Sequence, residues 1–163
     1  MVPREYSHWI ESFSHREINF GYGGLKLFAP EEIEEGQVGY SRSAEGASFC
    51  DGMPGSWKSE WIVIGLDTLV GDPIILDTSS SVLPVMTAAQ GEESWDPDLI
   101  SASLSAFDKA MKMIQRLSVG RENPVELEKN PLPDEEKARA LEAIRALNGN
   151  EAGLEFWKLM LEA

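Results

Sequence analysis

The chain has 163 residues, of which 42% are hydrophobic, so we expect one domain with a core large enough to fold without a metal or a disulfide. Its hydrophobic residues form no unbroken run of the roughly 18 that a membrane span requires. We therefore expect no membrane partner. The formal net charge of -14, from 28 acidic and 14 basic residues, makes nucleic acid a poor partner.

The acidic residues are concentrated in the middle of the sequence. Residues 31–98 contain 14 acidic residues and only 2 basic ones, Arg42 and Lys58, which leaves a local net charge of -12. Two interpretations are open for this segment. It forms either a solvated surface that confers solubility or a face that meets a basic partner.

The N-terminus and the cysteine count indicate the compartment. Residues 1–8 mix charges of both signs and precede no apolar stretch or small-residue cleavage site, so we expect no secretion signal. Cys50 is the single cysteine, which rules out an intramolecular disulfide and gives no indication of an oxidising compartment. We therefore expect a cytoplasmic protein.

The first 50 residues predict a short helix, a strand and a helical turn. Four apolar residues recur three and four apart, as one helix face requires: Tyr6, Trp9, Ile10 and Phe13. The glycine-rich residues 21–24 interrupt this pattern, and residues 25–28 are typical of a brief strand. Pro30 then begins a helical turn over residues 31–35.

Residues 57–89 carry the strongest strand signal in the chain. Residues 61–66 and 74–77 are rich in β-branched side chains, and residues 82–87 follow a turn of threonine and serines. The connections are too short for a parallel crossover, so we predict an antiparallel three-strand meander. Pro73 and Pro84 fall where a strand starts or lies at an edge.

The remaining sequence is predicted to be helical. Asp96 suits the cap of a first helix and Pro97 its first position. One apolar stripe follows, and Gly120 ends it: Ile100, Leu104, Phe107, Met111 and Ile114.

A connector over residues 123–133 leads to a helical tail. Its second helix has one apolar face: Ala138, Leu141, Ile144 and Leu147. A last amphipathic stretch carries Leu154, Trp157 and Leu161. We expect the tail to pack on the body through Leu141, Ile144, Trp157 and Leu161, because two such helices alone bury too little apolar surface. A more loosely docked hairpin is the alternative.

The sequence contains none of the phosphate-binding, dinucleotide, serine-hydrolase or zinc-protease motifs. His8 and Glu11 offer two metal ligands at helical spacing without a third. Cys50 would need His8 or His15 beside it to act as a nucleophile. We therefore predict no catalytic residue, no metal and no cofactor.

Asp67, Asp72 and Asp77 form a regularly spaced acidic set that would suit acid/base or metal chemistry in an enzyme. Aspartate is favoured in turns because its side chain accepts from nearby backbone amides. We expect all three to be turn or strand-end residues that share no cleft.

Three tryptophans flank the predicted strands: Trp57, Trp61 and Trp95. Core packing is the usual role of this residue, but Trp95 lies among acidic residues and is expected to be partly exposed. An exposed aromatic ringed by charge is typical of binding centres. The predicted partner-binding residues are therefore Glu92, Glu93, Trp95 and Asp96.

The strand W-I-V-I-G-L-D at residues 61–67, the turn G-D-P at 71–73, the apolar strand ending in Asp77 and the pair P-V at 84–85 resemble the SUKH superfamily. This superfamily contains bacterial immunity proteins and fungal regulators of cell-wall (glucan) synthesis. The resemblance covers residues 57–117. Its matching residues are expected to define the fold: Trp61, Gly65, Gly71, Asp72, Pro84 and Val85.

The resemblance implies an α+β fold with a mixed, largely antiparallel sheet, a central meander flanked by helices, and here an additional C-terminal helical tail. The expected organisation is a single domain over residues 1–163, with a core at about 20–120 and the extension at about 121–163. The implied function is non-enzymatic: binding and neutralising a cognate toxin, often a nuclease and so a basic protein. A regulatory scaffold that binds a cellular protein, like the fungal members, is the alternative.

Overall fold

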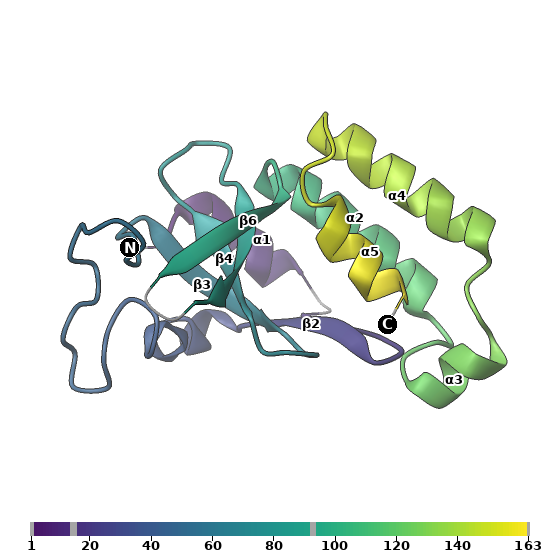
Figure 1. Ribbon diagram of the computed structural model, residues 1–163, viewed down its shortest axis with the longest axis horizontal. Helices are drawn as coiled ribbons and strands as arrows, with labels where there is room; N and C mark the ends of the chain where they lie inside the picture. The colour runs from purple at the N-terminus through teal and green to yellow at the C-terminus, as the bar shows by residue number, and fades with distance from the viewer. Residues whose placement is uncertain (1, 14–15, 92–93, 163) are drawn as a thin grey trace.

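The structure is a computed structural model that describes residues 2–13, 16–91 and 94–162 (Figure 1). Its strands form one antiparallel sheet in chain order: β1 (Glu17–Phe20), β2 (Gly23–Leu27), β3 (Trp61–Asp67), β4 (Pro73–Asp77), β5 (Val85–Gln90) and β6 (Trp95–Ser101). The predicted α+β class and the central meander β3–β4–β5 are confirmed. The pairing of these strands is antiparallel throughout rather than mixed.

Five α-helices accompany the sheet in the described residues: α1 (Arg4–Ser12), α2 (Leu104–Ser118), α3 (Pro124–Lys129), α4 (Asp134–Asn148) and α5 (Leu154–Glu162). Two short 3₁₀ turns, η1 (Pro30–Glu32) and η2 (Glu35–Gln37), replace the single helical turn predicted after residue 29. Figure 1 shows α2, α4 and α5 gathered at one end of the molecule, with α1 behind the sheet. None of the helices described is long and apolar enough to cross a membrane.

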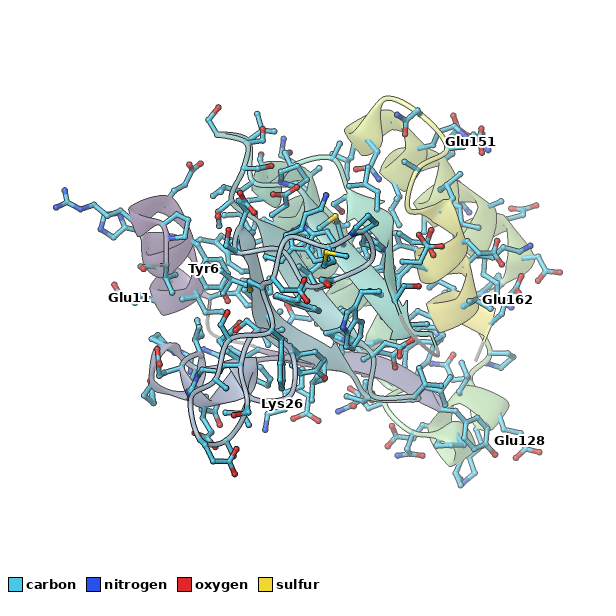
Figure 2. The ribbon with its side chains drawn as sticks, turned by 60° about the vertical axis from the view of Figure 1, so that its left-hand side comes forward. Tyr6, Glu11, Lys26, Glu128, Glu151 and Glu162 are labelled. Atoms are coloured by element: carbon cyan, nitrogen blue, oxygen red, sulfur yellow. The ribbon has the colours of Figure 1, made fainter. Side chains whose placement is uncertain are left out.

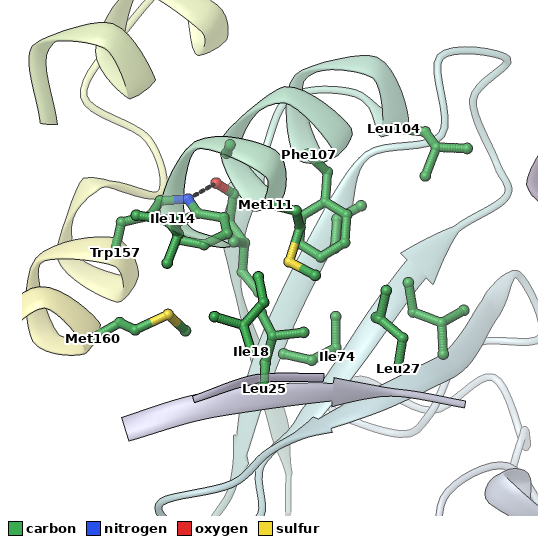
Figure 3. Close-up of a cluster of buried hydrophobic side chains, with 14 of the residues drawn as sticks. Ile18, Leu25, Leu27, Ile74, Leu104, Phe107, Met111, Ile114, Trp157 and Met160 are labelled. Carbon is green, nitrogen blue, oxygen red and sulfur yellow. Dashed lines mark hydrogen bonds between the residues drawn. The ribbon is translucent and has the colours of Figure 1, made fainter. Parts of the chain in front are cut away.

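The main core lies between one face of the sheet and helices α1, α2 and α5. Ile18, Leu25 and Ile74 from the strands meet Phe107 and Met111 of α2 there, as Figure 3 shows. Successive strand residues point to opposite faces, so Ile74 and Leu76 enter this core while Ile75 points away from it. The apolar stripe of α2 thus packs on the sheet face to which Ile74 and Leu76 point.

A second, smaller core covers the opposite face of the sheet. It consists of Trp57, Trp61, Val63, Ile75 and Ala88. The indole Nε1 of Trp57 donates to the backbone oxygen of Trp61 over 3.1 Å, which satisfies its buried donor. The long segment between β2 and β3 therefore packs on the sheet through its tryptophan.

The helical tail packs on the body and covers one end of the edge strand β6. Trp157 is fully buried, and its Nε1 donates to the backbone oxygen of Ile100 over 3.2 Å (Figure 3). Asn148 accepts from the amide of Ala102 over 2.9 Å and donates to the oxygen of Ala152 over 3.0 Å. The expected contacts of the tail are confirmed, with Ile144, Trp157 and Leu161 buried in the main core and Leu141 packed against it.

The predicted start of the first long helix at Asp96 is wrong, because residues 95–101 form β6. The helix α2 begins at Leu104 and is capped by Ser103, whose Oγ accepts from the amide of Ala106 over 3.1 Å. The amide of Trp95 donates to the oxygen of Gly55, which lies outside the sheet, so this amide points away from β5. Because backbone nitrogens two residues apart on a strand point to the same side, the nitrogen of Pro97 also points away from β5. A proline whose nitrogen points to the open edge removes no hydrogen bond of the sheet. The pair Asp96 and Pro97, which predicted a helix start, is therefore equally compatible with an edge strand.

Two elements were not predicted, and one strand starts later than expected. Strand β1 forms a hairpin with β2 across Gly21 and Tyr22, and α3 occupies part of the presumed connector. The N-cap of α3 is Asn123, whose Oδ1 accepts from the amide of Glu126 over 3.0 Å. Strand β5 begins at Val85, three residues later than the predicted strand.

Candidate functional site

A groove of about 880 Å³ lies between α5 and the turn of residues 67–72 that joins β3 to β4. Between these two walls, residues of the sheet complete it: Gly23 and Gly24 of β2, Thr87 of β5, and Asp98 and Leu99 of β6. Its volume is within the range of protein sites that bind ligands or peptide segments. We refer to it below as the groove.

Apolar side chains on both walls of the groove are open to solvent. Leu69 and Val70 on the turn are 55% and 68% exposed, and Leu159 on α5 is 59% exposed. Phe156 and Met160 lie three residues before and one residue after Leu159, and they line the groove from the same side of α5. Exposed apolar side chains gathered in one depression mark a surface that contacts another molecule.

Six carboxylates line the groove, and we call them the acidic rim: Asp67, Asp72, Asp98, Glu151, Glu155 and Glu162. Figure 2 shows Glu151 and Glu162 toward opposite ends of the α5 segment. None of the described residues that line the groove is lysine, arginine or histidine. Glu151 is paired with Arg145, Nε to Oε1 2.8 Å, so the negative potential comes mainly from the other five.

Asp67 and Asp77 stabilise turns, as expected from their positions. Oδ1 of Asp67 accepts from the amide of Val70 over 3.3 Å and from that of Leu69, and Oδ1 of Asp77 accepts from the amide of Ser79 over 2.9 Å. The expectation that no two of the three aspartates share a cleft is wrong, because Asp67 and Asp72 both line the groove. The amide of Asp67 donates to the oxygen of Asp72 over 2.8 Å, which closes the turn and brings both residues to one wall.

The fold shifts the pKa of the Asp72 carboxyl. Burial raises the pKa of Asp72, and the nearby charge of Asp67 raises it further. The folded protein therefore holds this proton to a higher pH than the unfolded chain does. The contribution of Asp72 to the free energy of unfolding consequently falls as the pH rises from the unfolded pKa through the folded one.

Asp72→Asn is therefore expected to be slightly more stable than the wild type at about pH 7. At about pH 2 the two proteins should be equally stable, because the Asp72 carboxyl is then protonated in both the folded and the unfolded state. Thermal unfolding of both proteins across this pH range measures the difference. Asp72→Glu, which retains the charge, serves as the control. A variant that is less stable at pH 7 would instead make Asp72 a residue that the fold requires.

The candidate metal and thiol sites lie apart from the groove. His8 and Glu11 are exposed on α1, which packs on the main core, whereas Cys50 packs against the core on the opposite face of the sheet. His15 falls outside the described residues. Within the described parts of the chain, no three histidine, cysteine or acidic side chains are grouped as metal ligands would be.

Of the predicted partner-binding residues, Glu92 and Glu93 fall outside the described residues. Trp95 is half-buried, and its ring packs edge-on against Trp57, centroids 5.1 Å apart, on the face of the sheet opposite α5. It does not line the groove. Asp96 is exposed and lies two residues before Asp98, so its side chain shares the strand face that carries the rim.

The six motif residues lie on or between β3, β4 and β5: Trp61, Gly65, Gly71, Asp72, Pro84 and Val85. Trp61 and Val85 are buried in the two cores. Gly65 pairs with Leu27 of β2, where a Cβ atom would lie 2.3 Å from the backbone oxygen of Lys26. Only Asp72 of this set reaches the groove.

The half of the groove that the tail provides was not predicted from the sequence. Glu155 and Glu162 are seven residues apart, a spacing that places side chains on one side of a helix, and Glu151 lies in the turn just before α5. This spacing was a usable signal for one wall. It was hidden because residues 99–163 as a whole contain 9 basic and 11 acidic residues.

Comparison with known proteins returned no matching family model, no similar curated protein and no similar solved structure. The resemblance to the SUKH superfamily therefore rests on the motif in residues 61–85 and the helix around Phe107 that follows it.

Proposed function

We propose that this chain is a non-enzymatic protein-binding module that holds a basic surface of its partner in the groove. We further propose that the partner is a toxin domain, which makes the chain an immunity protein. One observation carries the proposal: six carboxylates surround an exposed apolar groove that no described cationic side chain lines.

Charge and apolar surface have different roles in this proposal. A toxin that cleaves nucleic acid is basic where it grips phosphate, and a carboxylate-rimmed groove attracts that surface over a long range. Complementary charge mainly raises the association rate. Burial of exposed apolar groups such as Leu159, Leu69 and Val70 then supplies affinity that charge alone does not.

The contacts of Asp67 favour binding over catalysis in the groove. A general base must reach a substrate proton, whereas the Asp67 carboxylate accepts from two amides of its own turn. Asp72 is the only other aspartate of the predicted set that lines the groove. Acid/base chemistry by Asp67 and Asp72 as a cooperating pair is therefore disfavoured.

The proposal predicts that a toxin gene lies beside the gene of this chain, and it is tested by expressing the chain together with the domain that such a gene encodes. The wild type is expected to restore growth. A variant in which three carboxylates of the acidic rim are replaced by lysine should not restore it, whereas a control in which three exposed glutamates outside the groove are replaced by lysine should. The rim variant is Asp98→Lys, Glu155→Lys and Glu162→Lys, and the control is Glu31→Lys, Glu35→Lys and Glu45→Lys. Both change the net charge equally.

Binding of the purified domains separates the remaining outcomes. The association rate is expected to fall steeply between about 0.1 M and 1 M salt, where the Debye length drops from about 10 Å to 3 Å. A wild type that neither protects cells nor binds the toxin domain would refute the immunity function in favour of a regulatory scaffold. A rim variant that protects as well as the control would show that the groove is not the site.

A further inference from the structure

We infer that the groove receives a single basic amphipathic α-helix of the partner, whose apolar stripe lies against α5 and whose lysine and arginine side chains reach the acidic rim. The inference rests on the proposed function and names the structural element that the groove recognises. Its support comes from the length of α5, the placement of the rim and the state of the nearest sheet edge.

One wall of the groove is itself a helix, which leaves the large apolar side chain of Leu159 exposed beside the buried Met160. The nine residues of α5 span about 13.5 Å at 1.5 Å per residue. Phe156, Leu159 and Met160 lie on one side of it at the spacing that forms ridges between packed helices. Leu159 remains largely exposed because no helix within residues 2–13, 16–91 and 94–162 covers it. A helix laid alongside α5 would fill this side as a neighbour in a bundle does.

The carboxylates form two rows that match the flanks of such a helix. Glu155 and Glu162 on α5 are seven residues apart, which is about two helical turns or 10.5 Å. Asp67, Asp72 and Asp98 line the groove from the sheet and its turn. A partner helix can pair with both rows. Basic residues seven apart on one flank would meet Glu155 and Glu162, and basic residues on the other flank would meet the three aspartates. Its apolar stripe then faces Leu69, Val70 and Leu159.

An extended segment is disfavoured because the adjoining sheet edge offers few backbone groups. The outer edge of β6 has its Trp95 amide bound to the oxygen of Gly55 over 2.8 Å, and Pro97 has no amide hydrogen. The oxygen of Ile100 accepts from Trp157 and Asn148. Addition of a partner strand requires a run of free donors and acceptors, which this edge lacks.

The probe is a synthetic peptide of about 18 residues with leucine at helical spacing and lysine elsewhere, compared with a peptide of the same composition whose leucines have no helical period. Binding is measured by fluorescence anisotropy at about 0.15 M salt, and helix formation by circular dichroism. The amphipathic peptide is expected to bind about tenfold or more tightly than its control and to gain helix on binding. Equal affinities of the two peptides would refute the inference.

Variants locate the binding and separate charge from apolar contact. Asp98→Lys, Glu155→Lys and Glu162→Lys together are expected to weaken the amphipathic peptide about tenfold or more, and Glu31→Lys, Glu35→Lys and Glu45→Lys about twofold or less. Leu159→Ala should weaken binding several-fold. Its control is Val82→Ala, because Val82 is similarly exposed at 54% but lies outside the groove, and it should leave binding unchanged.

Failure of the helix inference is distinguishable from failure of the proposed function. If the folded toxin domain binds in a rim-dependent way while the amphipathic peptide does not, the groove recognises a folded surface and only the helix inference is wrong. If the peptide binds but the rim and control variants weaken it equally, its binding reflects the overall charge of -14 and the groove is not its site.

Discussion

Trp157→Ala is expected to lower the free energy of unfolding by about 3–5 kcal/mol, the largest effect of any single change proposed for this chain. The Trp157 ring is fully buried and packs against Phe107 and Phe156, with centroids 6.1 and 5.1 Å away. Its removal leaves a cavity and also leaves the oxygen of Ile100 without one of its donors. Both effects loosen the tail from the sheet.

Urea unfolding monitored by circular dichroism measures this loss. Trp157→Phe, which retains an aromatic ring but cannot donate to Ile100, is expected to lose less than the alanine variant. Leu159→Ala, on the exposed side of α5, should unfold nearly as the wild type does. An unchanged midpoint for Trp157→Ala would mean that the tail does not contribute to the stability of the body.

Gly65→Ala is expected to destabilise the protein by about 3 kcal/mol, at the upper end of the usual range for overpacking. The new Cβ would lie 2.3 Å from the oxygen of Lys26 and 2.9 Å from the Cα of Leu27. Both are backbone atoms of the neighbouring strand β2, so no side-chain rotation relieves the contact. The pair β2–β3 would have to separate in the middle of the sheet.

Gly71 provides the matched comparison, because it belongs to the same motif but is required for its backbone conformation rather than for a close approach of strands. A Cβ there meets no atom within 4 Å, whereas its φ of 84° lies in the left-handed region. Gly71→Ala should therefore lose about 1–2 kcal/mol through backbone strain. Gly71→Asn should lose less because asparagine tolerates this conformation. If Gly65→Ala were no more destabilising than Gly71→Ala in thermal unfolding, close strand approach would not explain the glycine at position 65.

The sequence alone determined the elements whose signals are local. Runs of β-branched residues at 61–66 and 74–77 became β3 and β4, because two buried strand faces need apolar side chains at successive positions. The stripe that includes Phe107, Met111 and Ile114 became the buried side of α2. Short connections likewise fixed the antiparallel order of the meander.

Some local sequence signals are compatible with two kinds of secondary structure, and there only the tertiary contacts determine which one forms. Asp96 and Pro97 are as acceptable at the open edge of a sheet as at the start of a helix. Pairing of β6 with β5 and the bond from the amide of Trp95 to Gly55 selected the strand. Strand β1 was missed for the same reason, since its four residues gain stability only by pairing with β2.

The groove depends most on the tertiary structure. The acidic excess of residues 31–98 was evident from the sequence and supplied Asp67, Asp72 and Asp98. The opposite wall comes from Glu155 and Glu162, more than 50 residues later, in a region whose average charge is close to neutral. Composition averages charge along the chain, whereas electrostatic potential depends on distance in space. The docking of Trp157 against Ile100 brings these carboxylates together; the amphipathic pattern predicted that Trp157 would be buried, but not that Ile100 would be its partner.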